Sequence, residues 1–258
     1  MQRLCFLILL LPWLSLSAQP LPPAQPVTVS AGIFIGGLIN KRNDGAYQLI
    51  LREAARRSGI TINEQVGPLK NAIMAVVNKQ SLAIYGMTEA LISQLGQENI
   101  ITSYPMGAYK LHLFTRKGEP VITSYRQLLG KKVGGVSGYE AYYSELIAQG
   151  IDIIYVSSEL TQMKQFVAHD LDVIIGFLPD WLPHLKQLNY EASFALHVGY
   201  DTMTARNTPE GRWFVNKISE ALQAMHKDGS IEALMGKRYL PFEYKPSQPY
   251  QWRSQSSF

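Results

Sequence analysis

Two separate blocks of alternating strand-like and helix-like segments constrain the fold of this chain more than any other feature. In the first block the strands are short, apolar and β-branched, and the helices carry apolar residues at intervals of three and four. Gly59 follows the first helix, where a glycine ends helices. The block comprises strand 27–31, helix 46–58, strand 60–65, helix 70–79 and strand 82–85. This order is typical of a parallel sheet covered by helices on both sides.

The second block repeats the alternation and sits inside the first. It comprises strand 110–115, strand 132–136, helix 139–149, strand 153–156, helix 159–168, strand 173–177 and strand 194–198. Strand 202–206 and helices 211–227 and 230–235 then return to the first half. We therefore predict an α/β protein of two lobes, each a mostly parallel sheet flanked by helices. Two crossings, near residues 106–110 and 200–205, would form a hinge, with ligand bound beyond the carboxyl ends of the strands.

The N-terminus has the order of a secretory signal peptide. A basic start at Arg3 precedes an apolar run over residues 4–16 and the small residues Ser17 and Ala18. A membrane-spanning helix needs about 20 apolar residues, and this run is shorter and contains Pro12. We predict a cleaved signal over residues 1–18, a proline-rich linker over 19–26 and a periplasmic mature protein.

Composition excludes several functional classes. The net charge of +4 is not gathered into a block of lysines and arginines, so we expect no nucleic-acid partner. The single cysteine, Cys5, lies in the predicted signal, which leaves the mature chain without a disulfide or thiol nucleophile. The five histidines show no metal-binding spacing, so we expect neither metal nor cofactor. Gly130-Lys131-Lys132 lacks the rest of a phosphate loop, and no Gly-x-Ser-x-Gly elbow is present.

Several segments, in order along the mature chain, carry a family resemblance. They are Ala-Ile-Tyr-Gly-Met-Thr at 83–88, Thr-Ser-Tyr-Pro at 102–105, the stretch 124–134 ending Gly-Lys-Lys-Val-Gly, and the helix and turn at 221–230. Together they resemble the family 3 periplasmic solute-binding proteins of ABC importers, which have the type II periplasmic binding fold. The resemblance implies lobe 1 over 27–108 plus 203–245, lobe 2 over 109–202 and a tail over 246–258.

The resemblance also implies a ligand site between the lobes. Gly86 and Thr88 would form one wall. Ser137, Gly138 and Tyr139 would form the other, at a helix start whose free N–H groups suit a carboxylate. Helix capping explains the serine equally well.

The charged groups that hold α-amino acids in this family are absent here. Ser93, Phe177 and Gly32 stand where the family has an arginine, an aspartate and an acidic residue. The other cleft positions are mostly aromatic or apolar, which suits a less charged ligand or one held by stacking. Packing in the lobe cores explains each of them equally well, and explains Phe34 better than ligand binding does. Lys70 would meet an acidic group or lie in solvent. The candidate ligand-binding residues are Phe34, Pro68, Lys70, Gly86, Thr88, Tyr104, Ser137, Gly138, Tyr139, Phe177 and Trp181.

These features favour a monomeric binding protein that delivers a small-molecule solute to an inner-membrane permease. One alternative is a ligand-sensing partner of a membrane signalling protein. Another is an enzyme on the same fold, for which Asp180 is the nearest candidate acid; without a visible acid–base pair we expect no catalysis.

Overall fold

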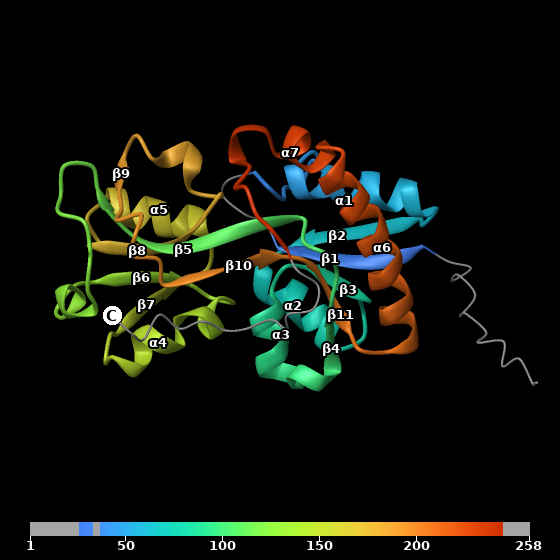
Figure 1. Ribbon diagram of the computed structural model, residues 1–258. Coiled ribbons are helices and arrows are strands. Elements are labelled where there is room, and N and C mark those ends of the chain that lie inside the picture. The colour runs from blue at the N-terminus through green and yellow to red at the C-terminus, as the bar shows by residue number, and fades with distance from the viewer. Residues whose placement is uncertain (1–25, 33–36, 245–258) are drawn as a thin grey trace, which may run out of the picture.

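The computed structural model describes residues 26–32 and 37–244. Two mixed sheets lie side by side, each flanked by helices (Figure 1). The first has the strand order β2-β1-β3-β11-β4 and the second the order β10-β5-β8-β6-β7, with β9 paired to β5. The predicted two-lobed α/β fold is therefore confirmed.

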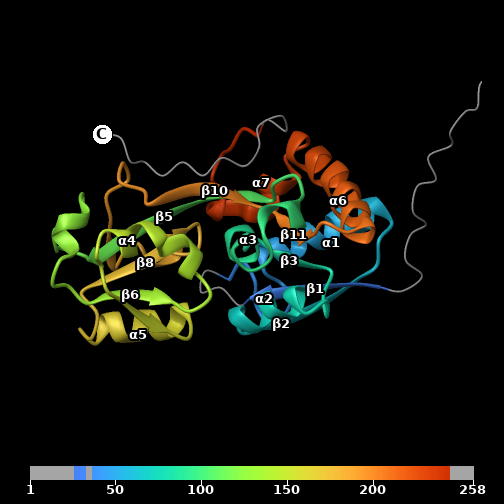
Figure 2. The ribbon, with the colours of Figure 1, turned by 90° about the horizontal axis from the view of Figure 1, so that it is seen from below.

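The first lobe consists of the chain up to β4 and from β11 onward. Helices α1, α6 and α7 pack together on one face of its sheet, and α2 and α3 cover the other (Figures 1 and 2). Its elements are β1 (Val27–Gly32), α1 (Ala46–Ser58), β2 (Ile62–Gly67), α2 (Leu69–Val77), β3 (Ala83–Tyr85), α3 (Thr88–Leu95), the 3₁₀ helix η1 (Gln97–Asn99), β4 (Ile100–Thr102), β11 (Met203–Arg206), α6 (Pro209–Lys227), α7 (Ser230–Met235) and η5 (Gly236–Arg238).

The second lobe is inserted between β4 and β11. Its elements are β5 (Gly107–Arg116), η2 (Tyr125–Leu128), β6 (Val133–Val136), η3 (Glu140–Tyr143), α4 (Ser144–Ala148), β7 (Ile153–Val156), α5 (Glu159–Val167), β8 (Val173–Leu178), η4 (Leu182–His184), β9 (Leu188–Asn189) and β10 (His197–Asp201). Helix α5 contacts β6, β7 and β8 on one face.

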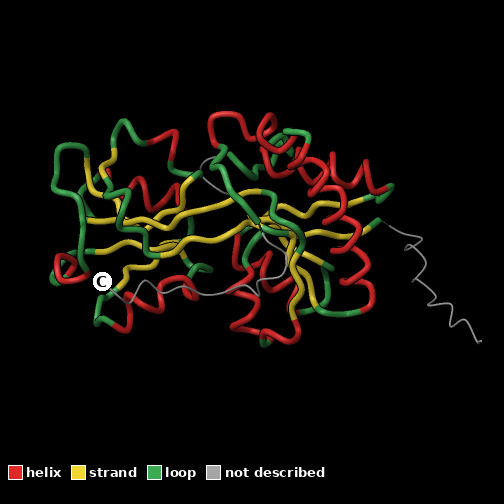
Figure 3. The backbone as a smooth tube through the Cα atoms, in the orientation of Figure 1, coloured by secondary structure: helices red, strands yellow, loops and turns green. Residues whose placement is uncertain are grey.

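Two adjacent crossings join the lobes. The chain leaves the first sheet after β4 and returns to it between β10 and β11 (Figure 3). The Met106 amide donates to the Asp201 carbonyl at 2.7 Å, and the Ser103 amide donates to the Met203 carbonyl at 2.9 Å. The two crossings are thus bonded to each other where they pass between the sheets.

Strand alternation decides which lobe 2 residues face the first lobe. Successive side chains of a strand point to opposite faces. On β8, Ile175 and Phe177 join an apolar core that continues into the first lobe. Ile174 and Leu178 join a separate cluster with Trp181 behind the sheet. Phe177 is therefore placed toward lobe 1 and Trp181 away from it.

Several details differ from the sequence-based prediction. The predicted helix over 139–149 is a 3₁₀ turn, η3, followed by the five-residue helix α4. Helix α3 was not predicted, and β2 begins two residues later than expected. The sheets are mixed because the strands beside the crossings, β11 and β5, run antiparallel to their neighbours.

Nothing in the described part of the chain tests export. No helix among those residues is long and apolar enough to cross a membrane. The predicted signal peptide over 1–18 lies outside the described residues, and so do all but Pro26 of the predicted linker and the whole of the predicted tail over 246–258.

Candidate functional site

A small enclosed cavity lies between the lobes, close to the crossings. Tyr47 and Met87 reach it from lobe 1, and Asp201 lies at the crossing itself. Lobe 2 contributes Tyr109, Tyr139, Tyr142, Phe177 and Asp180. Its volume is about 20 Å³, which is enough for about one water molecule.

Phe177 is the centre of an aromatic group that forms the lobe 2 side of the cavity. The ring of Phe177 meets the rings of Tyr139, Tyr109 and Tyr142 edge to face, with centroids 5.0, 5.2 and 5.4 Å apart. His197 stacks on Tyr109 at 5.5 Å. Such contacts are favourable beyond simple burial, so these rings form a fixed wall.

Two carboxyl groups line the same cavity. Asp180 is 6% exposed, and its Oδ1 has no hydrogen-bond partner among the described residues. Burial, with Glu159 and Asp201 nearby, raises its pKa well above the ordinary value, while Arg238 acts in the opposite direction.

Asp201 accepts a hydrogen bond of 2.5 Å from the Tyr47 hydroxyl. Burial raises the pKa of Asp201 to about 7; the Tyr47 hydrogen bond opposes this, and the nearby Glu89 adds to it. Both carboxyls of the cavity therefore hold their protons to a higher pH than usual, and a positive charge beside them would favour their ionised form.

The lobes touch beside this cavity. A methyl group placed on Gly138 of lobe 2 would lie 3.0 Å from the side chain of Leu69 in lobe 1. The turn η3, which follows Gly138, also contacts α3 of lobe 1. The structure is thus a closed arrangement of the two lobes.

The structure brings four of the candidate ligand-binding residues to this region. Tyr139 and Phe177 line the cavity. Gly86 lies beside Asp201, whose Oδ1 is 3.1 Å from where a Cβ on Gly86 would be. Gly138 is at the lobe contact, where its φ of +106° favours glycine.

The helix start proposed as a carboxylate seat is not present in the expected form. Gly138 precedes a 3₁₀ turn, and its amide donates to Glu140 Oε2 at 2.8 Å. The Ser137 amide donates to the Val156 carbonyl at 2.9 Å. Because both amides already have acceptors, this wall does not offer them to a ligand.

The remaining candidates lie elsewhere. The Thr88 hydroxyl is buried against the hydroxyls of Thr204 and Thr202, at 2.8 and 3.4 Å. Pro68 and Lys70 are exposed on either side of Leu69.

Tyr104 and Trp181 face away from the cavity, and one candidate is not described. Tyr104 bonds His226 Nδ1 on α6 at 2.5 Å. Trp181 is fully buried behind the second sheet, packed with Phe114. Phe34 lies outside the described residues.

Sequence reasoning missed most of the cavity lining. Tyr47, Met87, Tyr109, Tyr142 and Asp201 were not candidates, and Asp180 was considered only as a possible acid. Tyr47 and Asp201 are 154 positions apart, so no local spacing links them. Met87 carried a signal, because it lies in the segment that resembles the solute-binding family.

No group of three or more histidine, cysteine, aspartate or glutamate side chains in residues 26–32 and 37–244 is arranged to hold a metal ion. Among the described residues that line the cavity, the polar side-chain groups are carboxyls and phenols.

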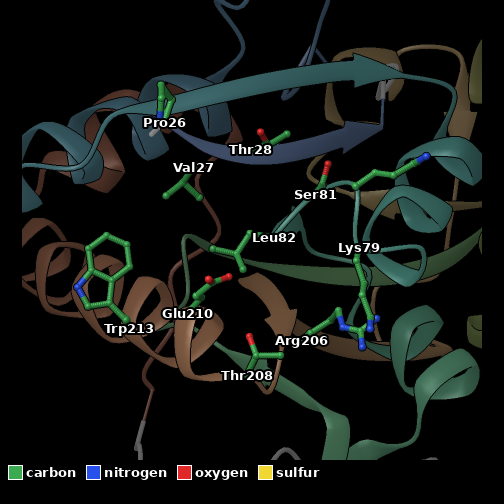
Figure 4. A pocket seen from close by; sticks show the side chains of 11 residues that line it. Pro26, Val27, Thr28, Lys79, Ser81, Leu82, Arg206, Thr208, Glu210 and Trp213 are labelled. Atoms are coloured by element: carbon green, nitrogen blue, oxygen red, sulfur yellow. The ribbon is translucent and has the colours of Figure 1, made fainter. Parts of the chain in front are cut away.

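A second, larger pocket of about 410 Å³ opens at the other end of lobe 1 (Figure 4). Trp213 and Glu210 of α6 lie on one side of it, and Val27 of β1 lies opposite. Lys79 and Arg206 are also in its lining, so it carries charges of both signs.

No protein-family model matches the sequence, and no curated protein matches it either. Solved structures do match. The GluR0 ligand-binding core from Nostoc punctiforme in complex with L-glutamate has a TM-score of 0.70 and 18% identity, over 84% of this chain and 100% of that one. A putative L-cystine ABC transporter from Listeria monocytogenes has a TM-score of 0.69 and 16% identity, over 83% and 95% of the chains.

A histidine kinase sensor domain with similarity to periplasmic binding proteins matches with a TM-score of 0.67 and 16% identity, over 83% of this chain and 96% of that one. At such identities the likeness shows the fold. This chain therefore has the two-lobed fold of periplasmic binding proteins.

Proposed function

We propose that this protein is a periplasmic solute-binding protein that captures one small organic solute between its two lobes. The observation that carries the proposal is the interlobe cavity, which is enclosed by residues of both lobes and of the crossing between them. A solute that contacts both walls favours the closed arrangement by its differential affinity for that state.

The two crossings act as the hinge. Residues 103–106 and Thr202 link the two sheets, and their backbone bonds run between the crossings themselves. Rotation about them separates Gly138 from Leu69 and opens the cavity without unfolding either sheet.

Delivery to an ABC importer is the leading role within this proposal. The similarity to the putative cystine transporter protein supports it. The similarity to the kinase sensor domain supports a second role, as the sensing partner of a membrane signalling protein. Neighbouring permease and ATPase genes would favour import, and a neighbouring sensor kinase gene would favour signalling.

A thermal-shift screen of a metabolite library tests the proposal. A solute at one hundred times its dissociation constant stabilises a protein by about 2.7 kcal/mol, or about 5 to 11 °C in a chain of this size. A screen in which no metabolite shifts the melting temperature would contradict solute binding. Turnover of a stabilising metabolite by the pure protein would instead support an enzyme.

A further inference from the structure

The ionisable groups that line the interlobe cavity include two carboxyls. Its lining contains Asp180 and Asp201 and, among the described residues, no lysine or arginine. Among the described residues neither aspartate has a basic side chain within ion-pair distance. Arg238 influences Asp180 from farther away. Two carboxyls in one cavity favour a cation, which stabilises their ionised form, over an anion.

The Asp180 carboxyl indicates that a hydrogen-bond donor belongs in the cavity. Its side chain is more than nine-tenths buried, it lines the cavity, and its Oδ1 has no hydrogen-bond partner in the described part of the chain. A buried polar atom without a partner is costly. A hydrogen-bond donor inside the cavity would remove that cost.

The aromatic wall suits the same kind of group. Tyr109, Tyr139, Tyr142 and Phe177 surround the cavity on the lobe 2 side. Aromatic faces attract cations within about 6 Å of the ring centre. The free space of about 20 Å³ matches an ammonium group, which is close to a water molecule in size.

Among the described residues, the cavity wall offers no comparable site for a carboxylate. The amides of Ser137 and Gly138 already donate to Val156 and Glu140. Lys70 is exposed and does not line the cavity.

We propose that the solute is an organic amine without a carboxylate, and that its ammonium group lies between Asp180 and Asp201 against the rings of Tyr139 and Phe177. This inference rests on the solute-binding function proposed above. It replaces the less charged ligand that the sequence favoured, because the sequence did not place the two aspartates at the cleft.

Matched pairs of probes that differ by one carboxylate test the inference. Histamine, agmatine and tyramine are each titrated beside histidine, arginine and tyrosine, by calorimetry and thermal shift, with the full-length mature protein. At least one of the amines is expected to bind, and to bind at least tenfold more tightly than its amino acid.

Charge-removing variants locate the site. Asp180→Asn is expected to weaken amine binding about ten- to hundredfold, as loss of a charged hydrogen bond does. Asp170→Asn removes an equal charge from the exposed surface of the same lobe and is expected to leave binding unchanged. Circular dichroism establishes that both variants fold, and Asp201→Asn serves as a second reporter if Asp180→Asn does not.

The outcomes distinguish a failure of this inference from a failure of the proposed solute-binding function. If none of the amines binds, or if an amino acid binds as tightly as its amine, the inference is wrong. It is also wrong if both aspartate variants keep full affinity. In any of these cases a neutral or acidic metabolite that stabilises the protein would leave solute binding standing. If no metabolite of any class binds, both proposals fail.

Discussion

The interlobe cavity and the pocket beside Trp213 differ in size, charge and enclosure. The cavity is about 20 Å³ and is lined by two carboxyls and an aromatic wall. The pocket is about 410 Å³ and mixes Glu210 with Lys79 and Arg206. The pocket lies within lobe 1, so filling it makes no difference between open and closed lobes. The smaller cavity, which both lobes line, is therefore the one whose occupation can favour lobe closure.

The largest expected effect is on the aromatic wall. Phe177→Ala should lower the free energy of unfolding by about 3 to 5 kcal/mol, because a buried ring leaves a cavity, and should abolish amine binding. Chemical denaturation and calorimetry measure the two effects. Phe166→Ala, in the separate cluster behind the second sheet, should cost similar stability and keep binding. Equal loss of binding in both variants would contradict the location of the site.

The next largest effect is expected on the pH dependence of the free energy of unfolding. The pKa of Asp201 is raised to about 7 in the folded protein, against about 3.9 in an unfolded chain. The contribution of protonated Asp201 to the free energy of unfolding is therefore fully present below about pH 4 and is lost as the pH rises through 7. The Tyr47 hydroxyl bonds the Asp201 carboxyl, and the nearby Glu89 raises the pKa of Asp201 through its charge. The raised pKa of Asp180 gives a pH dependence of the same sign.

Asp201→Asn should therefore stabilise the protein increasingly from pH 5 to pH 8. The expected gain in free energy of unfolding is about 2 kcal/mol at pH 8. This is roughly half of what the full pKa shift of Asp201 would give, because its side chain is partly exposed. Comparison with the parent protein at each pH cancels His112, His184 and His197, whose lowered pKa values give the opposite slope. Denaturant midpoints of the variant and the parent protein at four pH values measure this stability difference. A difference that stays constant with pH would mean that Asp201 does not titrate as described.

A smaller effect is expected at the lobe contact. Gly138→Ala combines a positive φ with a methyl group 3.0 Å from Leu69. Gly118→Ala is a matched control, since Gly118 has a φ of +91° and open space around it. Gly138→Ala should cost about 1 kcal/mol more than its control and should enlarge the radius of gyration. Equal radii in the two variants would show that the lobes do not touch there in solution.

The smallest effect is expected at the larger pocket. Trp213→Ala should leave amine affinity within about twofold, because changes distant from a site act independently of it. Calorimetry measures this. A tenfold loss of affinity would move the binding site from the interlobe cavity to the pocket and reverse the comparison.

The sequence predicts those elements whose ends carry their own signals. Helix α1 ends where Gly59 adopts a left-handed conformation. Helix α6 begins at Pro209 after the N-cap Thr208, two residues before the predicted start at Gly211, although both residue types are typical of a helix start. Helix α3 carries no such signal. It follows Met87, a non-glycine residue at positive φ that caps nothing with its side chain.

Turn η3 shows why periodicity alone was insufficient. Tyr139, Tyr142, Tyr143 and Leu146 have helical spacing, which predicts one α-helix. In the structure the Tyr143 hydroxyl accepts the Val136 amide at 3.0 Å, and this tertiary bond accompanies a tighter first turn. The cavity was harder still to predict, because Tyr47 and Asp201 meet only through the fold.

Small-angle scattering of the pure protein, with and without a saturating amine from the matched pairs, tests the central account most directly. The amine is expected to close the two lobes about the crossings at residues 103–106 and Thr202. A smaller radius of gyration with the amine than without it is the expected result. An unchanged radius at saturation, with binding established in the same sample, would contradict closure around the interlobe cavity.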